Sequence, residues 1–430
     1  MTTTERGSAT SATEMESVES FRERARAWLA ANVEKGATLG GDYRTGETEE
    51  EELALIAQAR ELQKKYYEAG FAGICFPTEY GGQGLSPAHQ RAFNEEVVGY
   101  QFPSILQIPT FVPCAAVLLE FGSEEQKKRH LPKIMSGEEI WMQFLSEPSG
   151  GSDVAAALTT AIRDGDEWVV NGSKIWTTGA WFSDYGLCLL RTNWDVPKHR
   201  GLSVFIIKIH QPNIELHRIE MINGSKEFCQ EFMTDLRVPD SDRVGEVDQG
   251  WTVGTRWMFH ERNAMGGGSP YVSGPMRRAG GGTDRRDPLV ELASKTGRLD
   301  DPRARDLIGE ARTLGRAQEE LSKRIAEGMG AGVFPDTTAA IARLMSSVVI
   351  NRHVNINLEM AGPAAVASNE GDVGAGVGMS FLMRQSGSIG GGTTEMARNN
   401  VSERVLGMPR EMTHDRNLAF RDVPKGPPSN

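Results

Sequence analysis

A polar, glycine-bearing loop near the middle of the chain has side chains that could hold a flat ligand. The segment reads FLSEPSGGSDV, and the hydroxyl groups of Ser146 and Ser152 stand on either side of Gly150 and Gly151. A hydroxyl can donate and accept hydrogen bonds, and a glycine lets a ligand approach the backbone closely. These residues predict a site for a planar molecule with hydrogen-bonding edges.

A second segment, EWVVNGSKIWTT, places an aromatic and a hydroxyl side chain two residues apart, at Trp176 and Thr178. Side chains alternate along a strand, so these two would share one face. An indole beside a hydroxyl suits a flat heteroaromatic ring. Each feature alone has an ordinary explanation, because Asn171-Gly172 favours a hairpin turn and a tryptophan often packs in a core.

Three zones would position these segments. Apolar residues recur at helical spacing over 17–135, which predicts an N-terminal α-helical domain. Short strand-like runs separated by turn signals over 136–245 predict a middle β domain, an antiparallel barrel or sandwich. Long helical patterns return over 246–410 and predict a domain like a four-helix bundle, with 411–430 as a tail whose end we expect to be frayed. The fold class is α+β.

Composition narrows the function classes. The net charge of −11 argues against nucleic acid or an anionic membrane as the main partner. The apolar runs are all shorter than the ~20 residues of a membrane span, and residues 1–16 look like a disordered lead without a signal core. The four cysteines stand far apart and the zinc-protease pattern HExxH is absent, so we expect no metal site. Free thiols are typical of a cytoplasmic protein.

The two segments together resemble the signature of the acyl-CoA dehydrogenase family. That signature reads T-E-P-x-A-G-S-D and then N-G-x-K-x-W-I-T-N, and the chain has SEPSGGSD over 146–153 and NGSKIWTT over 171–178. The end piece GTTEMARN, followed by LGMPRE, is similar to the family's G-T-s-E-I-q-R-N and LGLPRE. The resemblance extends over about residues 20–410.

The resemblance implies a flavoenzyme of lipid catabolism that binds FAD. It would remove the pro-R α-proton and a β-hydride from an acyl-CoA thioester and form a trans-2-enoyl-CoA, with electrons leaving through electron-transferring flavoprotein. A homodimer or homotetramer is implied, with a heterotetramer as an alternative. The matched positions for the flavin or thioester are Gln143, Leu145, Ser146 and Ser152, with Trp176 packed on the flavin, Thr178 near its N5 atom, and Thr393 and Glu395 at its other end.

The usual catalytic carboxylate is missing from the end piece. Many family members have Glu directly before the G-T, where this chain has Gly391, whose N–H would still help to hold the thioester oxygen. A subset of the family carries its base in a Glu-Arg pair on the first helix after the β domain, and Glu261-Arg262 matches it. Glu261 is therefore the expected base and Arg262 would line the acyl-CoA pocket. An ordinary surface ion pair is the alternative, and Glu395 and Glu147 are rival carboxylates ranked lower.

Other departures leave alternatives open. The family's pyrophosphate-binding Arg segment is not recognisable, and the replacement would come from Arg277, Arg278, Arg285 or Arg286 in a Gly- and Arg-rich stretch expected to be a flexible loop. The displaced base favours a branched, cyclic or bulky acyl group. One alternative function is a non-catalytic partner subunit of a heteromeric dehydrogenase. Another is a flavin-dependent oxidase or monooxygenase on the same fold.

Overall fold

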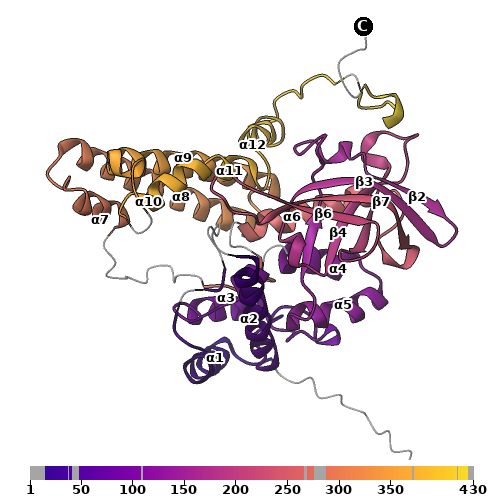
Figure 1. The fold of residues 1–430 in the computed structure, drawn as a ribbon, viewed down its shortest axis with the longest axis horizontal. Helices are drawn as coiled ribbons and strands as arrows, with labels where there is room; N and C mark the ends of the chain where they lie inside the picture. The colour runs from indigo at the N-terminus through magenta and orange to yellow at the C-terminus, as the bar shows by residue number, and fades with distance from the viewer. Residues whose placement is uncertain are drawn as a thin grey trace, which may run out of the picture.

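The protein has helical, sheet and helical regions in chain order, as predicted. The computed structural model describes residues 15–36, 38–40, 48–107, 110–265, 269–275, 287–369, 372–413 and 415–424. In Figure 1 the N-terminal helices lie at the bottom, the sheet lies at the right, and the C-terminal helices project to the left as an arm. None of the helices in these ranges is long and apolar enough to cross a membrane.

The N-terminal helices form where apolar residues recur at helical spacing behind a capping residue. The first helix buries Phe21, Ala25 and Leu29 on one face. The second begins at a capping box in which Thr48 and Glu51 bond to each other's backbone N–H. The bounds are α1 Val18–Asn32, α2 Glu49–Glu68, α3 Pro87–Glu96, α4 Ala116–Phe121 and α5 Glu124–Ser136, and a π-helix over Thr110–Ala115 precedes α4.

The central sheet is open and sandwich-like and does not close into a barrel. Its strands are β1 Trp141–Phe144, β2 Thr160–Asp164, β3 Glu167–Thr178, β4 Tyr185–Arg191, β5 Leu202–Lys208, β6 Ile214–Ile219, β7 Phe228–Pro239 and β8 Arg243–Val244. Their order is β6-β7-β3-β2-β4-β5-β8, with β1 against β4. Most pairs are antiparallel, as expected. β1 runs parallel to β4, and the ends of β2 and β4 share one parallel pair.

Two cores meet at β4 and β5, whose residues are nearly all buried. Alternate side chains point to opposite faces of a strand. Leu187 and Leu189 therefore join a core with the N-terminal helices and Trp257. Cys188 and Leu190 join a second core inside the sheet. These strands are covered on both sides, which explains their continuous apolar sequences.

The C-terminal region begins with α6 Gly250–Met265, which packs on β5, α4 and the π-helix. The arm then follows, with α7 Pro288–Lys295, α8 Pro302–Gly330, α9 Ala339–Ala361, α10 Ala375–Met383, α11 Ser386–Ile389 and α12 Thr394–Asn400. Within this arm, α8 and α9 pack extensively against each other. α12 packs on α9.

The end of the chain returns to the sheet domain instead of fraying at once after residue 411. Phe420 is buried and stacks on Trp194 with ring centroids 5.3 Å apart. The guanidinium of Arg191 lies 4.1 Å from the Phe420 ring centroid, and the Phe420 N–H donates to the carbonyl of Val196. An aromatic anchor with a cation on its face explains why this segment docks. Within the tail, residue 414 and residues 425–430 lie outside the described part.

A buried ion pair fixes the loop between β1 and β2. The ammonium of Lys174 lies 2.8 Å from Glu147 and also donates to the carbonyl of Leu189. Glu147 accepts the N–H groups of Leu158 and Thr159. Burial acts to raise the pKa of Glu147, but the ammonium outweighs it and holds that pKa below its ordinary value. Glu147 therefore has a structural role here.

We predict that Lys174→Met lowers the free energy of unfolding by about 3–5 kcal/mol, because it leaves the Glu147 charge buried without its partner. Chemical denaturation measures the loss. The control is Arg237→Met, which removes an exposed pair with Asp164 and Glu167 and should leave the free energy of unfolding nearly unchanged. Equal losses in the two variants would contradict the assigned role of the buried pair.

Candidate active site

Helix α6 brings Glu261 to the start of the sheet. Trp257, one turn earlier on the same face, is fully buried, and its indole N–H donates to Oε1 of Gln143 over 2.8 Å. The side chain of Gln143 also hydrogen-bonds Glu261. Since Oε1 is already an acceptor, the amide NH₂ is the donor to the carboxylate. One glutamine on β1 thus orients both side chains of α6.

The surroundings of Glu261 favour its neutral form. Burial raises the pKa of this carboxyl, while the charge of Arg262 and the hydrogen bond from Gln143 lower it by less. The side chain of Arg262 itself is exposed. The buried thiol of Cys114 is close enough for the Glu261 charge to raise its pKa further. A carboxylate in such a place is a stronger base than one in water.

An adjacent face of α6 is held by one acidic residue of α4. Glu120 accepts hydrogen bonds from Arg256 at 2.6 and 2.9 Å and lies 2.8 Å from Nε2 of His260. His260 is buried, so this histidine orients the helix and does not line an open site. Fixing the helix on this side keeps Glu261 turned toward Gln143.

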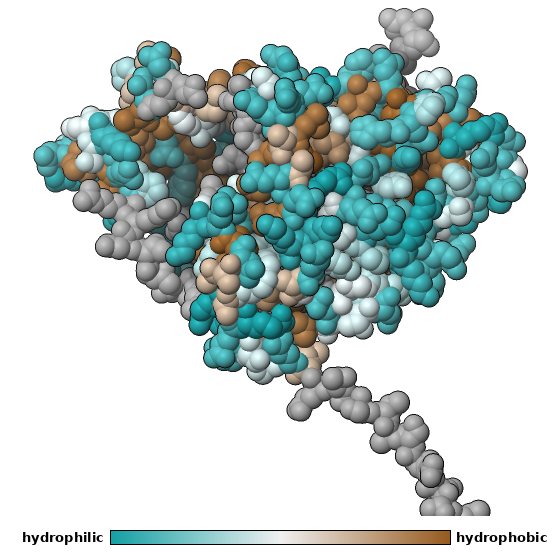
Figure 2. Space-filling view, turned by 60° about the horizontal axis from the view of Figure 1, so that its bottom comes forward, coloured by the Kyte–Doolittle hydropathy of each residue, from teal (hydrophilic) through white to brown (hydrophobic). Residues whose placement is uncertain are grey.

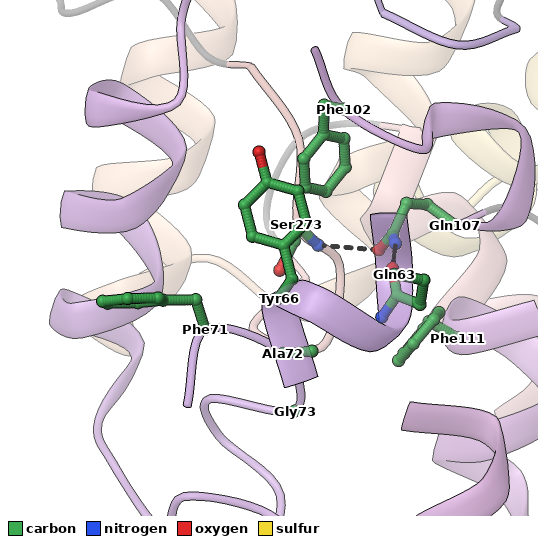
Figure 3. A pocket seen from close by; sticks show the side chains of 9 residues that line it. All are labelled: Gln63, Tyr66, Phe71, Ala72, Gly73, Phe102, Gln107, Phe111 and Ser273. Carbon is green, nitrogen blue, oxygen red and sulfur yellow. Dashed lines mark hydrogen bonds between the residues drawn. The ribbon is translucent and has the colours of Figure 1, made fainter. Parts of the chain in front are cut away.

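The segment after α6 is tied to the N-terminal helices by buried amide side chains. Gln107 accepts the N–H of Ser273 at 3.2 Å and donates to Gln63 at 3.1 Å. Gln90 donates to the Ser273 hydroxyl, and Asn94 accepts the N–H of Gly274. Figure 3 shows Gln63, Gln107 and Ser273 of this set around a small pocket in the helical domain. The pocket is part of this anchor and contains none of the expected site residues.

The predicted flavin-facing residues come together beside β3. The N–H of Ile175 donates to the carbonyl of Ser146 over 3.0 Å, so the loop after β1 lies against the end of β3. Trp176 and Thr178 are both exposed, and the indole retains 53% of its accessible area. Ser152 is exposed in the same loop. A large indole left open beside hydroxyls and backbone groups fits a flat aromatic ligand. Leu145 instead packs partly on the core shared with the helices.

The triple-glycine segment forms a loop between α11 and α12. Gly391 has a φ of 69° and Gly392 one of 99°, which strain any residue with a Cβ. Arg343 on α9 donates from one nitrogen, Nη2, to the carbonyls of Gly387, Gly390 and Gly392 at 3.1, 2.7 and 3.0 Å. The backbone conformation is thus specified from α9.

The remaining expected residues lie on α12 or outside the described part. Thr393 caps α12 with its hydroxyl, and Glu395 is an exposed partner of Arg398. Hydrogen bonds between the described residues do not join this helix to Glu261 or Trp176. The four arginines proposed for the pyrophosphate lie between residues 276 and 286, outside the described residues. Among those that are described, His, Cys, Asp and Glu form no cluster that could hold a metal.

Sequence reasoning did not find the groups that position the expected ones. Trp257 and Glu261 are four residues apart, a spacing that would have placed them on one helix face. Nothing in the sequence links Gln143 to that face, since β1 and α6 are more than a hundred residues apart. Arg343 also carries no motif, and its three carbonyl acceptors appear only in the folded chain.

Comparison with known proteins agrees with this fold. The acyl-CoA dehydrogenase N-terminal domain matches residues 15–138 and the middle domain of the same family matches residues 143–235. The acyl-CoA dehydrogenase IpdE1 of Mycobacterium tuberculosis is 33% identical over 406 residues, which cover 92% of this chain and 99% of that protein. The chain belongs to the acyl-CoA dehydrogenase family, whose members are FAD-dependent oxidoreductases that act on acyl-CoA.

Solved structures show the same relationship. One is the "Tcur3481-Tcur3483 steroid ACAD", with a TM-score of 0.70 and 25% identity, covering 92% of this chain and 98% of that one. Another is a chain of the ChsE4-ChsE5 complex from Mycobacterium tuberculosis, with a TM-score of 0.68 and 25% identity, covering 93% and 100%.

We predict that Arg343→Met loosens the glycine loop, because three carbonyls lose a charged donor together. The free energy of local opening should fall by roughly 1.5–3 kcal/mol. Hydrogen–deuterium exchange of residues 385–393 measures this fall. Arg316→Met, which removes an exposed pair on α8, should leave exchange of the loop unchanged. Unchanged exchange in both variants would show that Arg343 does not hold the loop.

Proposed function

We propose that the protein oxidises an acyl-CoA thioester to the trans-2-enoyl-CoA, with Glu261 removing the α-proton. The observation that carries this proposal is the surroundings of Glu261. Its carboxylate is partly buried on α6, accepts a hydrogen bond from Gln143 and has a raised pKa. An α-proton next to a thioester is weakly acidic, so its removal needs a base of this kind.

The developing charge on the thioester oxygen needs hydrogen-bond donors. The N–H of Gly391 is the candidate donor, and Arg343 fixes the neighbouring carbonyls so that the loop keeps one conformation. Preorganised donors cost little reorganisation during reaction. A Cβ on Gly391 would meet no atom within 4 Å, so there is room for a side chain, but the left-handed φ disfavours one.

FAD fits the face formed by Trp176, Thr178 and the loop at Ser146. When bound, FAD accepts the β-hydride of the acyl chain. Trp176 offers its open indole face, and Thr178 and Ser152 offer exposed hydroxyls. Thr393 and Glu395 on α12 are proposed to contact the cofactor of a neighbouring subunit. Electrons would leave through electron-transferring flavoprotein.

We propose a bulky, ring-bearing acyl group as substrate. One related structure carries the name "steroid ACAD", which supports this class. The glycine loop adds to the support, because no side chain projects from Gly391 into the space around it. Arg262, exposed at the end of α6, is proposed to contact the CoA part.

The second candidate function is a subunit of a heteromeric dehydrogenase. Two related structures carry paired names, Tcur3481-Tcur3483 and ChsE4-ChsE5, and the second is described as a complex. The C-terminal arm also exposes apolar side chains, and Figure 2 shows brown, hydrophobic surface gathered on it. These residues include Val348, Ile350, Leu382 and Ile389. An exposed apolar face of this kind indicates contact with another chain.

Glu261→Gln tests the proposed base. We expect kcat to fall by roughly 100- to 10,000-fold while FAD stays bound, because the amide keeps the shape but cannot take a proton. The assay uses a panel of acyl-CoA thioesters with an artificial electron acceptor, and the flavin spectrum reports binding. Glu215→Gln, at an exposed carboxylate on β6, should leave kcat unchanged.

The pH profile gives a second measurement of the same residue. The base must be ionised, and burial raises its pKa, so kcat should fall on the acid side at a pH above that of an ordinary glutamate. A flavin-bearing Glu261→Gln enzyme with normal kcat would rule out this base.

The oligomeric state separates the two candidate functions. A catalytic homo-oligomer purified alone should carry FAD and have the mass of a dimer or tetramer by light scattering. Val348→Glu on the exposed face of α9 should shift that mass downward, whereas Ile162→Glu at an exposed position of β2 should not. A flavin-free monomer that gains FAD only with a second chain would favour the heteromeric subunit.

A further inference from the structure

The end of β3 leaves regular strand geometry at the residue proposed to face the flavin. Its pairing with β7 shifts between Ile175 and Thr177, and Trp176 between them has a φ of 63°. An L-residue rarely adopts this conformation, and it persists only where the surroundings determine it. Trp176 contacts Phe228 edge-on at 5.8 Å but remains half exposed, so its own packing does not explain the bulge.

The next residue, Thr177, is buried and makes two polar contacts. Its Oγ1 lies 3.0 Å from the carbonyl oxygen of Cys229 and also contacts Oε1 of Glu231. A hydroxyl has one proton to donate, and a carbonyl oxygen can only accept. If Thr177 donates to Cys229, its contact with Glu231 is a hydrogen bond only when the carboxyl carries a proton and donates it.

Glu231 is placed to carry that proton. It lies on β7 with no exposed surface, and within the described part of the chain its Oε2 has no hydrogen-bond partner. Burial raises its pKa to about 8. Burying an ionised carboxylate with one oxygen that accepts no hydrogen bond would cost much free energy at this site. Burying a neutral carboxyl that donates one hydrogen bond costs much less.

The hydrogen bond with Thr177, the backbone N–H of Glu231 and the charge of Lys174 lower the pKa of Glu231 by less than burial raises it. Lys174 is its partner across β3, but that ammonium already contacts Glu147 and the Leu189 carbonyl. Burial raises the pKa of the Cys229 and Cys188 thiols to about 12, so both are neutral. On the other side, β6 contributes Leu216 opposite Glu231.

We propose that Glu231 is a protonated positioning residue whose carboxyl donates to Thr177 and so maintains the bulge that presents Trp176 and Thr178 to the flavin. This inference rests on the proposed flavin contacts of those two side chains. Ionisation would remove the proton that Glu231 donates. The Glu231 carboxylate and the Cys229 carbonyl would then both face the Thr177 hydroxyl, which has one proton for two acceptors. The bulge, and with it the flavin site, should then loosen in alkaline solution.

The first measurement does not depend on flavin or on activity. An infrared difference spectrum between wild type and Glu231→Gln at neutral pH should show the carbonyl band of a protonated carboxylic acid in the wild type alone. In flavin-free protein, amide exchange of residues 175–178 should match in the two proteins near pH 7. Above about pH 8 exchange should be faster in the wild type, because glutamine keeps a donor at every pH.

Flavin binding gives the functional readout. If only the protonated form binds, FAD affinity of the wild type should fall roughly tenfold between about pH 7 and about pH 9, and that of Glu231→Gln should stay level. Thr177→Val should weaken binding at all pH values, and Thr177→Ser, which keeps the hydroxyl, should restore it. Comparing Glu231→Gln with the wild type, and Thr177→Val with Thr177→Ser, shows whether a change in binding comes from the removed group or from a folding defect of one variant.

The outcomes separate the two proposals. Absence of the carboxylic acid band, or a band with the same exchange and affinity profiles in wild type and Glu231→Gln, overturns the role of Glu231. If neither protein binds FAD while the band and the exchange difference are present, the flavin proposal fails and the protonated support of the bulge stands.

Discussion

The proposed chemistry depends on keeping water away from one carboxylate on α6. Trp257 fills the core shared by the sheet and the N-terminal helices, and this packing fixes how deeply α6 sits. Glu261 lies one turn later at the edge of this core, where it is partly buried and Gln143 is its amide donor. Moving α6 outward would return Glu261 to solvent and to an ordinary pKa. The packing of a tryptophan thus determines the strength of the proposed base.

A second constraint acts through the backbone of the glycine loop. The resemblance to the family led us to expect a glutamate at the position of Gly391, and the backbone conformation at this position favours glycine. The left-handed conformation of Gly391 and Gly392 is stabilised by carbonyls that converge on Arg343. A loop of this shape favours glycine, so the absence of a carboxylate and the fixed direction of the backbone follow from one conformation.

The sequence predicted the parts of this protein that depend on local pattern. Helical spacing of Phe21, Ala25 and Leu29 predicted α1, and turn signals between short apolar runs predicted the sheet. It did not predict the docking of Phe420, because that contact depends on Arg191 at the end of β4 and Trp194 in the following loop, both distant in the sequence. It placed Trp176 and Thr178 on one face by alternation but missed the bulge. Bulges and long-range hydrogen bonds arise from tertiary packing, which single-sequence patterns do not contain.

Three glutamates near the proposed site show how strongly the surroundings determine the charge of one side-chain type. Glu147 is buried but ionised, because Lys174 and two backbone N–H groups compensate its charge. Glu231 is equally enclosed, yet its nearest cation is committed elsewhere, so the neutral form is favoured. For Glu261, burial raises the pKa, and the charge of Arg262 and the hydrogen bond from Gln143 lower it by less. A general base must take a proton from its substrate, and of the three only Glu261 is proposed to do so, because Glu147 is paired with Lys174 and Glu231 contacts the Thr177 hydroxyl.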